Sequence, residues 1–181
     1  TSHPYYWSGF AIHGLSVVVL GLMLFQAPAS QAWGVMLFAA IGTLSWSLIE
    51  YVLHRFVLHE MPLFKDWHAA HHARPGALIC TPTIVSTVLI GALVFLPAMW
   101  VTDMWRAVAL TFGVLLGYLA YAITHHGIHH WQGHNAWLKR RKRWHALHHR
   151  MDAPHACYGV TSDFWDHVFR SHDARPPAGC V

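Results

Sequence analysis

Eighteen histidines occur in this chain of 181 residues, and their spacing indicates metal binding. Two stretches have the pattern HxxHH, namely HAAHH at positions 68–72 and HALHH at positions 145–149. Residues three and four apart lie on one face of a helix, so each stretch can present three imidazoles to one region. Imidazole is the commonest metal ligand in proteins and loses its proton near neutral pH, which suits both triplets to holding an ion.

Two further stretches contain pairs of histidines. In HRFVLH, His54 and His59 are five residues apart, about 140° around an ideal α-helix. They can share one ion only if the helix ends or bulges between them, and otherwise they serve different ions. THHGIHH at positions 124–130 contains two pairs spaced i, i+4, and these pairs are about 100° apart on a helix. Both pairs therefore cannot face the same ion.

The clustered imidazoles are numerous enough for two metal ions. The two triplets, the pair in HRFVLH and one pair from THHGIHH make ten, whereas a mononuclear site uses three or four. Di-iron bundles of the ferritin-like kind need Glu-x-x-His pairs, and neither Glu50 nor Glu60 has a histidine at that offset, which excludes that class. Imidazole suits zinc, copper, iron and nickel, so the ligand type alone does not name the metal.

The elements that must position these histidines are membrane-spanning helices. Hydrophobic residues make up 55% of the chain and charged residues only 11%, unlike an average soluble domain. Four apolar runs, at about 9–27, 33–53, 83–102 and 105–125, approach the roughly 20 residues that a spanning helix needs. No cleavable leader pattern precedes the first run, so we expect it to be a retained anchor. The short connectors predict two hairpins in an all-α integral membrane protein.

The histidines and most of the charges lie outside these runs. The segments 54–82 and 126–181 are expected to form a helical cap that holds the two-metal site, and residues 1–181 make a single membrane domain. Of the twelve Lys and Arg residues, only Arg106 lies at the connector end opposite the histidines, so the positive-inside rule places the histidines on the cytoplasmic face. The run KRRKR at 139–143 is expected to contact anionic lipid head groups, since nothing else resembles a nucleic-acid-binding module.

This location suggests a chemistry. A two-metal site at the lip of a membrane bundle can be reached by an acyl chain in the bilayer and by soluble electron donors from the other side. Iron there could activate dioxygen to attack an unactivated C–H bond, which zinc, having no redox chemistry, cannot do. We therefore predict an oxidoreductase in which the metal centre itself is catalytic, and we assign no separate protein acid or base.

The order of these motifs carries a family resemblance. HRFVLH, HAAHH, THHGIHH and HALHH, followed by YGVTSDFWDHVF at 158–169, resemble the fatty acid hydroxylase (sterol desaturase) superfamily, and most closely its fatty acid 2-hydroxylase branch. The resemblance runs from about Glu50 to Phe169. It implies an integral membrane dimetal oxygenase that uses dioxygen and electrons from a separate cytochrome b5 type or ferredoxin type donor. It also implies iron in the active enzyme, with zinc possible in the purified protein.

The family pattern also implies which residues bind the metals. Carried over position by position, the implied ligands are His54, His59, His68, His71, His72, His125, His129, His145, His148 and His149. His126 stands where relatives often have tyrosine, so His126, His129 and His130 form an alternative triplet. We expect His130 to be an alternative ligand or a hydrogen-bond partner of the ligands, and His126 to lie outside the site. Asp163 and Asp166 could accept a ring N–H from a ligand histidine.

Several other functions fit parts of this pattern. A lipid or sterol desaturase and a carotenoid hydroxylase belong to the same class of oxygen-dependent enzymes. A zinc-dependent membrane lipid hydrolase would need no electrons and no dioxygen. A metal-binding membrane protein is a further alternative. Metal transport would need ionisable residues along a path inside the spans, and because the middles of the second to fourth runs contain none, His13 is the one candidate. The predicted function is hydroxylation of a lipid acyl chain.

Overall fold

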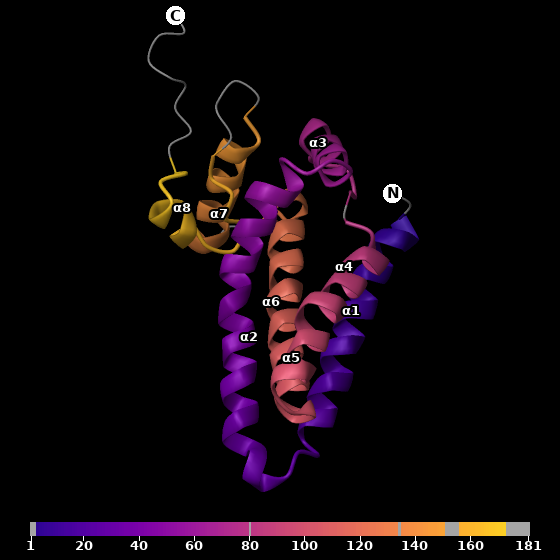
Figure 1. The fold of residues 1–181 in the computed structure, drawn as a ribbon. Helices are drawn as coiled ribbons and strands as arrows, with labels where there is room; N and C mark the ends of the chain where they lie inside the picture. The colour runs from indigo at the N-terminus through magenta and orange to yellow at the C-terminus, as the bar shows by residue number, and fades with distance from the viewer. Residues whose placement is uncertain (1–2, 80, 134, 151–155, 173–181) are drawn as a thin grey trace, which may run out of the picture. The chain divides into compact units, whose positions relative to one another are not determined.

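Helices make up the regular secondary structure of the described residues, as Figure 1 shows. The computed structural model describes residues 3–79, 81–133, 135–150 and 156–172. In chain order the elements are α1 (His3–Leu24), the 3₁₀ turn η1 (Ala29–Gln31), α2 (Ala32–Val52), the π-helical η2 (Leu53–Leu58), α3 (Phe64–Ala73), α4 (Thr83–Ile90), the π-helical η3 (Gly91–Phe95), α5 (Leu96–Val101), α6 (Met104–His130), α7 (Ala136–His148) and α8 (Phe164–Val168). Within the predicted cap, positions 80, 134, 151–155 and 173–181 lie outside the described residues.

Four helical stretches are long and apolar enough to cross a membrane. They are His3–Leu24, Ala29–Leu58, Thr83–Val101 and Met104–His130, and they contain 22, 30, 19 and 27 residues. A hydrocarbon core needs roughly 20 residues of helix. Each stretch overlaps one of the four predicted apolar runs, which confirms an all-helical integral membrane protein. The membrane limits of the spans stay a prediction.

The chain divides into two compact units, and helices α2 and α6 contribute residues to both. We call Thr1–Trp46 with Leu78–Ala120 the helical unit, and Ser47–Ala77 with Tyr121–Val181 the histidine unit. The single domain over residues 1–181 stays a prediction.

In the helical unit, α2 and α6 approach each other closely at two glycines. A Cβ atom on Gly42 would lie 2.3 Å from the carbonyl oxygen of Leu110, and one on Gly113 would lie 2.2 Å from that of Ala39. Backbone atoms cannot tolerate such contacts, so this spacing requires glycine at both positions. Small residues are the usual means of close helix packing in membranes, where contact between backbones replaces a hydrophobic driving force.

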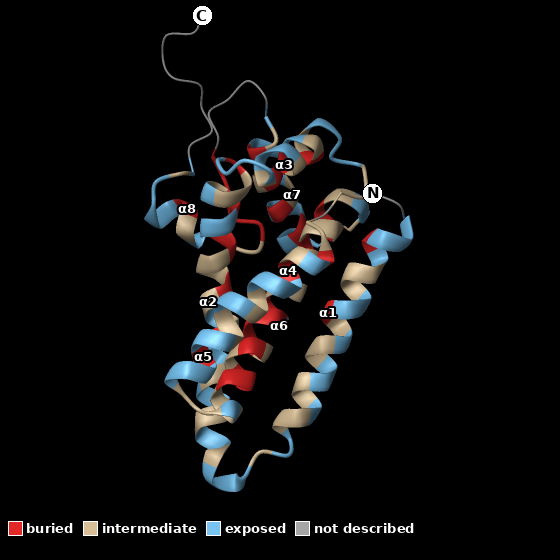
Figure 2. Ribbon diagram, turned by 45° about the vertical axis from the view of Figure 1, so that its right-hand side comes forward, coloured by how far each residue is buried: buried red, intermediate tan, exposed pale blue. Residues whose placement is uncertain are grey.

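Helix α6 is the most enclosed of the four stretches. In its most apolar window 44% of the residues are buried, against 6–11% in the other three, and Figure 2 shows buried residues gathered along this helix. Its buried residues include Ala107, Val108 and Ala109. The other three stretches expose apolar side chains over much of their length, as helices surrounded by hydrocarbon do.

The third stretch remains helical although it contains Pro97. Helix α4 passes into η3 and then into α5, so the backbone widens into a π-helix just before the proline. Proline has no N–H, and its ring meets the carbonyl four residues earlier, which disrupts an α-helix. A π-helical turn shifts the hydrogen bonds by one residue and so accommodates the proline.

His13 is buried in the helical unit and has a partner on each ring nitrogen. Nδ1 lies 2.7 Å from the carbonyl oxygen of Gly9, and Nε2 lies 3.2 Å from Oγ of Ser86. The ring centroid is 4.7 Å from that of Tyr118. These contacts join α1 to α4 and α6, so the role of His13 is helix packing.

The histidine unit combines the ends of α2 and α6 with η2, α3, α7 and α8. It has two small apolar clusters among the described residues: one comprises Ile128, Leu138 and Val160 with Tyr121 packed against it, and the other comprises Ala156 and Cys157 with Trp144. Asn135 begins α7, where its side chain accepts a hydrogen bond from the backbone N–H of Leu138 at 2.7 Å. The other buried residues of this unit include His54, His59, His68, His71, His145 and His148, so polar side chains occupy much of its interior.

Candidate metal centre

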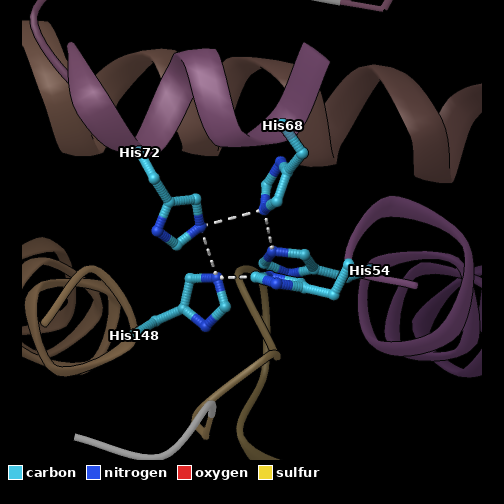
Figure 3. A group of neighbouring side chains, drawn as sticks. His54, His68, His72 and His148 are labelled. Carbon is cyan, nitrogen blue, oxygen red and sulfur yellow. Dashed lines mark hydrogen bonds between the residues drawn. The ribbon is translucent and has the colours of Figure 1, made fainter. Parts of the chain in front are cut away.

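Five histidines from three segments of the histidine unit meet at one place. His54 lies in η2 and His59 directly follows it, His68 and His72 lie on α3, and His148 ends α7. One ring nitrogen of each lies within 4.8 Å of one from every other. Figure 3 shows four of these side chains pointing toward a common centre. We call these residues the five-histidine group.

The π-helix η2 explains how His54 and His59 reach the same group. On an α-helix, residues five apart diverge by about 140°. In a π-helix the hydrogen bonds run from residue i to residue i+5, which brings such residues onto nearly the same face. The two ring centroids are 5.4 Å apart. From the sequence, these two residues could share an ion only if the helix ended or bulged between them, and the π-helix is such a bulge.

The contacts between these five rings cannot all be hydrogen bonds. Their Nε2 atoms form a chain of four contacts of 3.0–3.1 Å in the order His54, His68, His72, His148 and His59. Nδ1 of His54 donates to the carbonyl of Tyr158 at 2.5 Å, and Nδ1 of His148 donates to that of Ala156 at 2.8 Å. In the neutral rings, Nε2 of both His54 and His148 therefore carries a lone pair.

An imidazole nitrogen carries either a proton or a lone pair, but not both. His68 must donate to His54, so Nε2 of His72 would have to accept from His68 and also donate to His148. At least one of the four contacts between Nε2 atoms therefore brings two donors or two acceptors together, so it is not a hydrogen bond. A cation resolves this conflict because all the lone pairs can then point to it. Nitrogen ligands about 2.1 Å from an ion and at right angles to each other are about 3 Å apart, as observed.

A second group of histidines lies in the same unit. His71, His125, His129 and His145 have ring nitrogens that all lie within 4.8 Å of one another, and we call them the four-histidine group. The ring centroid of His71 is 4.8 Å from those of His125 and His129. Nε2 of His145 is 2.9 Å from Nε2 of His129. These residues come from α3, α6 and α7.

The four-histidine group contains buried nitrogens that lack a partner. Within the described residues, neither ring nitrogen of His71 has a hydrogen-bond partner, and neither does Nδ1 of His145. A buried polar atom without a partner costs about 1–3 kcal/mol. A metal ion bound by one nitrogen of each ring removes part of this cost, so both groups fit a metal ion.

Each HxxHH triplet is divided between the two groups, which differs from the expectation that its three rings converge. His71 belongs to the four-histidine group, whereas His68 and His72 belong to the other. Neighbouring positions on a helix are about 100° apart, while positions i and i+4 stay nearly aligned. In the second triplet, His145 and His149 are therefore aligned, and His148 is the residue that faces the five-histidine group.

His149 contacts both groups. Its Nε2 atom lies 2.9 Å from Nε2 of His145, and its ring stacks on His72 with centroids 4.2 Å apart and planes 16° apart. The two groups contain nine of the ten residues implied as ligands, and the tenth, His149, touches a member of each.

The structure separates the four histidines of THHGIHH. These residues form the last turns of α6, and only His125 and His129 lie in the four-histidine group. His126 stacks on the exposed His130, with ring centroids 4.6 Å apart. The rings of His129 and His130 are 6.4 Å apart. The arrangement matches the predicted choice of pair, although binding of metal by these residues stays a prediction.

Outside the spanning stretches, burial keeps several of the clustered imidazoles neutral. Loss of solvation, reinforced by repulsion from neighbouring histidines, lowers the pKa of His71 to about 2 and that of His149 to about 3. The same causes hold the pKa of His68 and of His145 well below the ordinary value. A neutral ring has a lone pair available, which is the form that binds metal ions.

Asp163 and Asp166 were expected to accept a ring N–H from a ligand histidine, but the contacts of their carboxylates are with other groups. Asp163 forms ion pairs with Arg140 at 2.5 Å and with the buried Arg141 at 3.1 Å. Burial would raise the pKa of Asp163, but the hydrogen bond from Arg140 and the charge of Arg141 lower it below its ordinary value. Asp166 is fully buried and accepts the backbone N–H groups of Tyr158 and Gly159, at 2.9 and 2.8 Å.

Sequence reasoning missed the groups that orient the histidines. Two are backbone carbonyls, of Ala156 and Tyr158, and a sequence pattern carries no signal for them. Sequence reasoning also missed Glu50, which contacts the loop that bears these carbonyls rather than a histidine: it is 3% exposed and accepts the backbone N–H groups of Val160 and Thr161 at 2.7 and 2.9 Å. A carboxylate inside an apolar run is itself a signal of function, and it could have identified Glu50.

The fold and the site define a helical membrane protein with a histidine-rich centre. The chain belongs to the fatty acid hydroxylase family, whose model matches residues 39–171. The structure is similar to that of "Full length scs7p (only hydroxylase domain visible)", with a TM-score of 0.76 and 27% identity, over 94% of this chain and 68% of the other.

Three relatives illustrate the similarity. The chain is 36% identical over 145 residues to the ceramide very long chain fatty acid hydroxylase scs7 of Schizosaccharomyces pombe, covering 73% of this chain and 41% of the relative. It is 35% identical over 143 residues to the dihydroceramide fatty acyl 2-hydroxylase FAH2 of Arabidopsis thaliana, covering 74% and 59%. It is 28% identical over 149 residues to the human fatty acid 2-hydroxylase, covering 76% and 40%. The chain thus spans less than two thirds of the length of these relatives.

Proposed function

We propose that this chain is a membrane-bound dimetal oxygenase that hydroxylates a lipid acyl chain, using dioxygen and electrons from a separate donor. The observation that carries this proposal is the convergence of nine histidines into two groups in a chain of the fatty acid hydroxylase family. The names of the three relatives describe hydroxylation of fatty acids or fatty acyl groups, and two of them give the 2-position; we extend that reaction class to this chain.

Each group would hold one metal ion. The five-histidine group offers five neutral nitrogens, and the four-histidine group offers four, with His149 as a further ligand within reach of both. Iron is the metal we expect in the active enzyme, and zinc could occupy the same nitrogens in the purified protein. Two iron ions would supply the redox capacity needed to use dioxygen against an unactivated C–H bond.

The protein's own contribution is to hold and orient these nitrogens. The carbonyls of Tyr158 and Ala156 each accept a ring N–H and so leave Nε2 of His54 and of His148 free for a metal ion. Burial disfavours the protonated form of the most enclosed rings, among them His68, His71 and His145. No side chain is assigned as a separate acid or base.

The membrane arrangement belongs to the proposal as well. The four spanning stretches would form two hairpins, with the histidine unit as a cap on the cytoplasmic face, where an electron donor of cytochrome b5 or ferredoxin type would reach it. Within the basic run, Lys139, Arg140 and Arg143 are exposed and would contact anionic lipid head groups. Arg141 would not, because it is buried and paired with Asp163.

Lipid profiling under labelled dioxygen tests this function. Cells with and without the protein would be grown under ¹⁸O₂, and their acyl chains compared by mass spectrometry, with the His148→Ala variant as the inactive control. We expect a new acyl species carrying one labelled oxygen that depends on His148. Loss of two hydrogens without gain of oxygen would indicate a desaturase instead, and lipid turnover that persists without dioxygen would indicate a zinc hydrolase.

A further inference from the structure

One loop orients histidines of the five-histidine group, and two buried carboxylates hold that loop. The loop comprises residues 156–161, and its carbonyls at Ala156 and Tyr158 accept the Nδ1–H of His148 and of His54. The Tyr158 ring also packs on this group, with its centroid 5.4 Å from those of His59 and His148. A displacement of the loop would therefore change the direction of two metal-binding nitrogens.

Asp166 holds the first half of the loop. One carboxylate oxygen accepts the N–H of Tyr158 at 2.9 Å and the hydroxyl of Ser171 at 2.8 Å. The other accepts the N–H of Gly159 at 2.8 Å and Nε1–H of Trp144 at 3.2 Å. With four donors on two oxygens and no exposure to solvent, this carboxylate has no simple neutral substitute.

Glu50 holds the second half of the loop. Oε1 accepts the N–H groups of Val160 and Thr161, and Oε2 accepts the hydroxyl of Thr161 at 2.5 Å. A neutral amide could replace this carboxylate, since its oxygen can accept both N–H groups while its NH₂ donates to the hydroxyl of Thr161. The two carboxylates therefore differ in how well they tolerate the loss of charge.

The backbone of the loop adopts a conformation that needs such support. Cys157 has a φ of 59°, in the left-handed region that costs a residue with a side chain free energy. A Cβ atom on Gly159 would lie 1.9 Å from the carbonyl oxygen of Ser162 and 2.9 Å from Oδ2 of Asp166. The loop is thus folded tightly onto the carboxylate.

Among the described residues, two members of the four-histidine group, His71 and His145, lack the Nδ1 contact that orients His54 and His148. Within the part of the chain that the structure describes, Nδ1 of His71, of His145 and of His149 has no hydrogen-bond partner. For these three rings, no hydrogen bond within the described residues selects the tautomer that leaves Nε2 available. A ligand that is already in its binding form loses less freedom when the ion binds, and such outer hydrogen bonds change metal affinity by about 10- to 100-fold.

We propose that Asp166 and Glu50 are positioning residues that act through the loop at 156–161, so that the five-histidine group binds its metal ion more tightly than the four-histidine group. The inference rests on the proposed two-metal centre. It makes the two sites unequal, with the four-histidine group losing its ion first.

Metal retention measures this inequality directly. The full chain, purified in detergent and loaded with Zn²⁺, would be dialysed against increasing chelator, and the zinc remaining per chain measured by mass spectrometry. We expect two ions per chain that leave in two steps. His59→Ala should remove the tighter step and His125→Ala the weaker one, which assigns each step to its group. Loading with Co²⁺ and following its absorption would report changes in ligand geometry at each step.

The positioning role is tested by variants outside the ligand set. Asp166→Asn must place its NH₂ against one pair of donors, so it should shift the tighter step by about tenfold or more toward lower chelator and leave the weaker step unchanged. Glu50→Gln should leave both steps unchanged, and Glu50→Leu should shift the tighter step. Asp103→Asn, which retains the acceptor oxygen at the start of α6, is the matched control and should shift neither.

Several outcomes would overturn the inference. The first is that Asp166→Asn shifts the weaker step, or shifts neither step. The second is that Glu50→Gln and Glu50→Leu have equal effects. The third is that His59→Ala removes the weaker step instead of the tighter one. If Asp166→Asn lost its helical circular dichroism, the two Glu50 variants would decide. A wild-type chain that holds two unequal ions but forms no hydroxylated lipid would contradict the proposed function and leave this inference intact.

Discussion

Neighbouring positions at the end of α6 offer a sharp test of which histidines bind metal. His125 lies in the four-histidine group, where its ring centroid is 4.7 Å from that of His129 and 5.0 Å from that of His145. His126 lies outside it and stacks on His130. Replacing each with alanine removes the same side chain from two consecutive positions of one helix. We expect His125→Ala to lose the metal ion of the four-histidine group and His126→Ala to keep it.

The size of the effect follows from the number of ligands. A protein site of four ligands for zinc is worth about 10–16 kcal/mol at neutral pH. Shared among the four histidines of this group, that is about 2.5–4 kcal/mol for each. Since about 1.4 kcal/mol is tenfold in affinity, His125→Ala should weaken binding about 100- to 1000-fold. His126→Ala should change it by less than about threefold, because its ring lies outside the group.

Zinc content against chelator concentration measures both variants, and helical circular dichroism confirms that each is folded. Hydroxylated lipid, measured by mass spectrometry in cells, should disappear in His125→Ala and persist in His126→Ala. The opposite pattern, with metal lost in His126→Ala and kept in His125→Ala, would show that the alternative triplet with His129 and His130 is the correct one and would refute the assignment.

Three further predictions follow from the structure. Lowering the pH should destabilise the metal-free protein, because the pKa of His71 is about 2 in the folded chain and about 6.5 in the unfolded chain. The contribution of His71 to the free energy of unfolding is therefore fully present above pH 6.5, and it falls by about 1.4 kcal/mol for each pH unit below that value. A melting temperature that is unchanged or higher at pH 5.5 than at pH 7.5 would contradict this. Gly113→Ala should cost about 1–3 kcal/mol in thermal stability because its Cβ would meet the backbone of α2, whereas Gly14→Ala, with nothing within 4 Å, should not; equal melting temperatures would argue against the close packing. His13→Leu should retain hydroxylation, since Ser86 still donates to the carbonyl of Thr83, and loss of product in a folded variant would show that His13 does more than pack helices.

The sequence alone was sufficient for the class of fold and for naming the histidines that the structure gathers into two groups, while their binding of metal stays a prediction. Both depend on local properties of the sequence, namely apolar runs long enough to cross a membrane and histidines at helical spacings. Such properties can be recognised without knowledge of tertiary contacts. The same rotation per residue that separated His125 from His126 in the sequence separates them in α6.

The tertiary structure determined how the histidines are divided between the five-histidine group and the four-histidine group. Helical spacing predicted that His68, His71 and His72 converge, yet the 100° between adjacent positions sends His71 to one group and His72 to the other once a second helix packs alongside. The π-helix that brings His54 and His59 together has no sequence signature, because a bulge depends on what the widened turn contacts.

The contacts that orient the histidines were the hardest feature to predict from the sequence. The carbonyl of Tyr158 meets His54 across 104 positions of chain, and Glu50 meets Thr161 across 111. Residue types and spacings describe which side chains share a face of a helix, and they carry no information about which distant backbone atom will lie against it. The sequence could therefore name the histidines, whereas only the folded chain determined their partition into two groups and the loop that holds two of them in place.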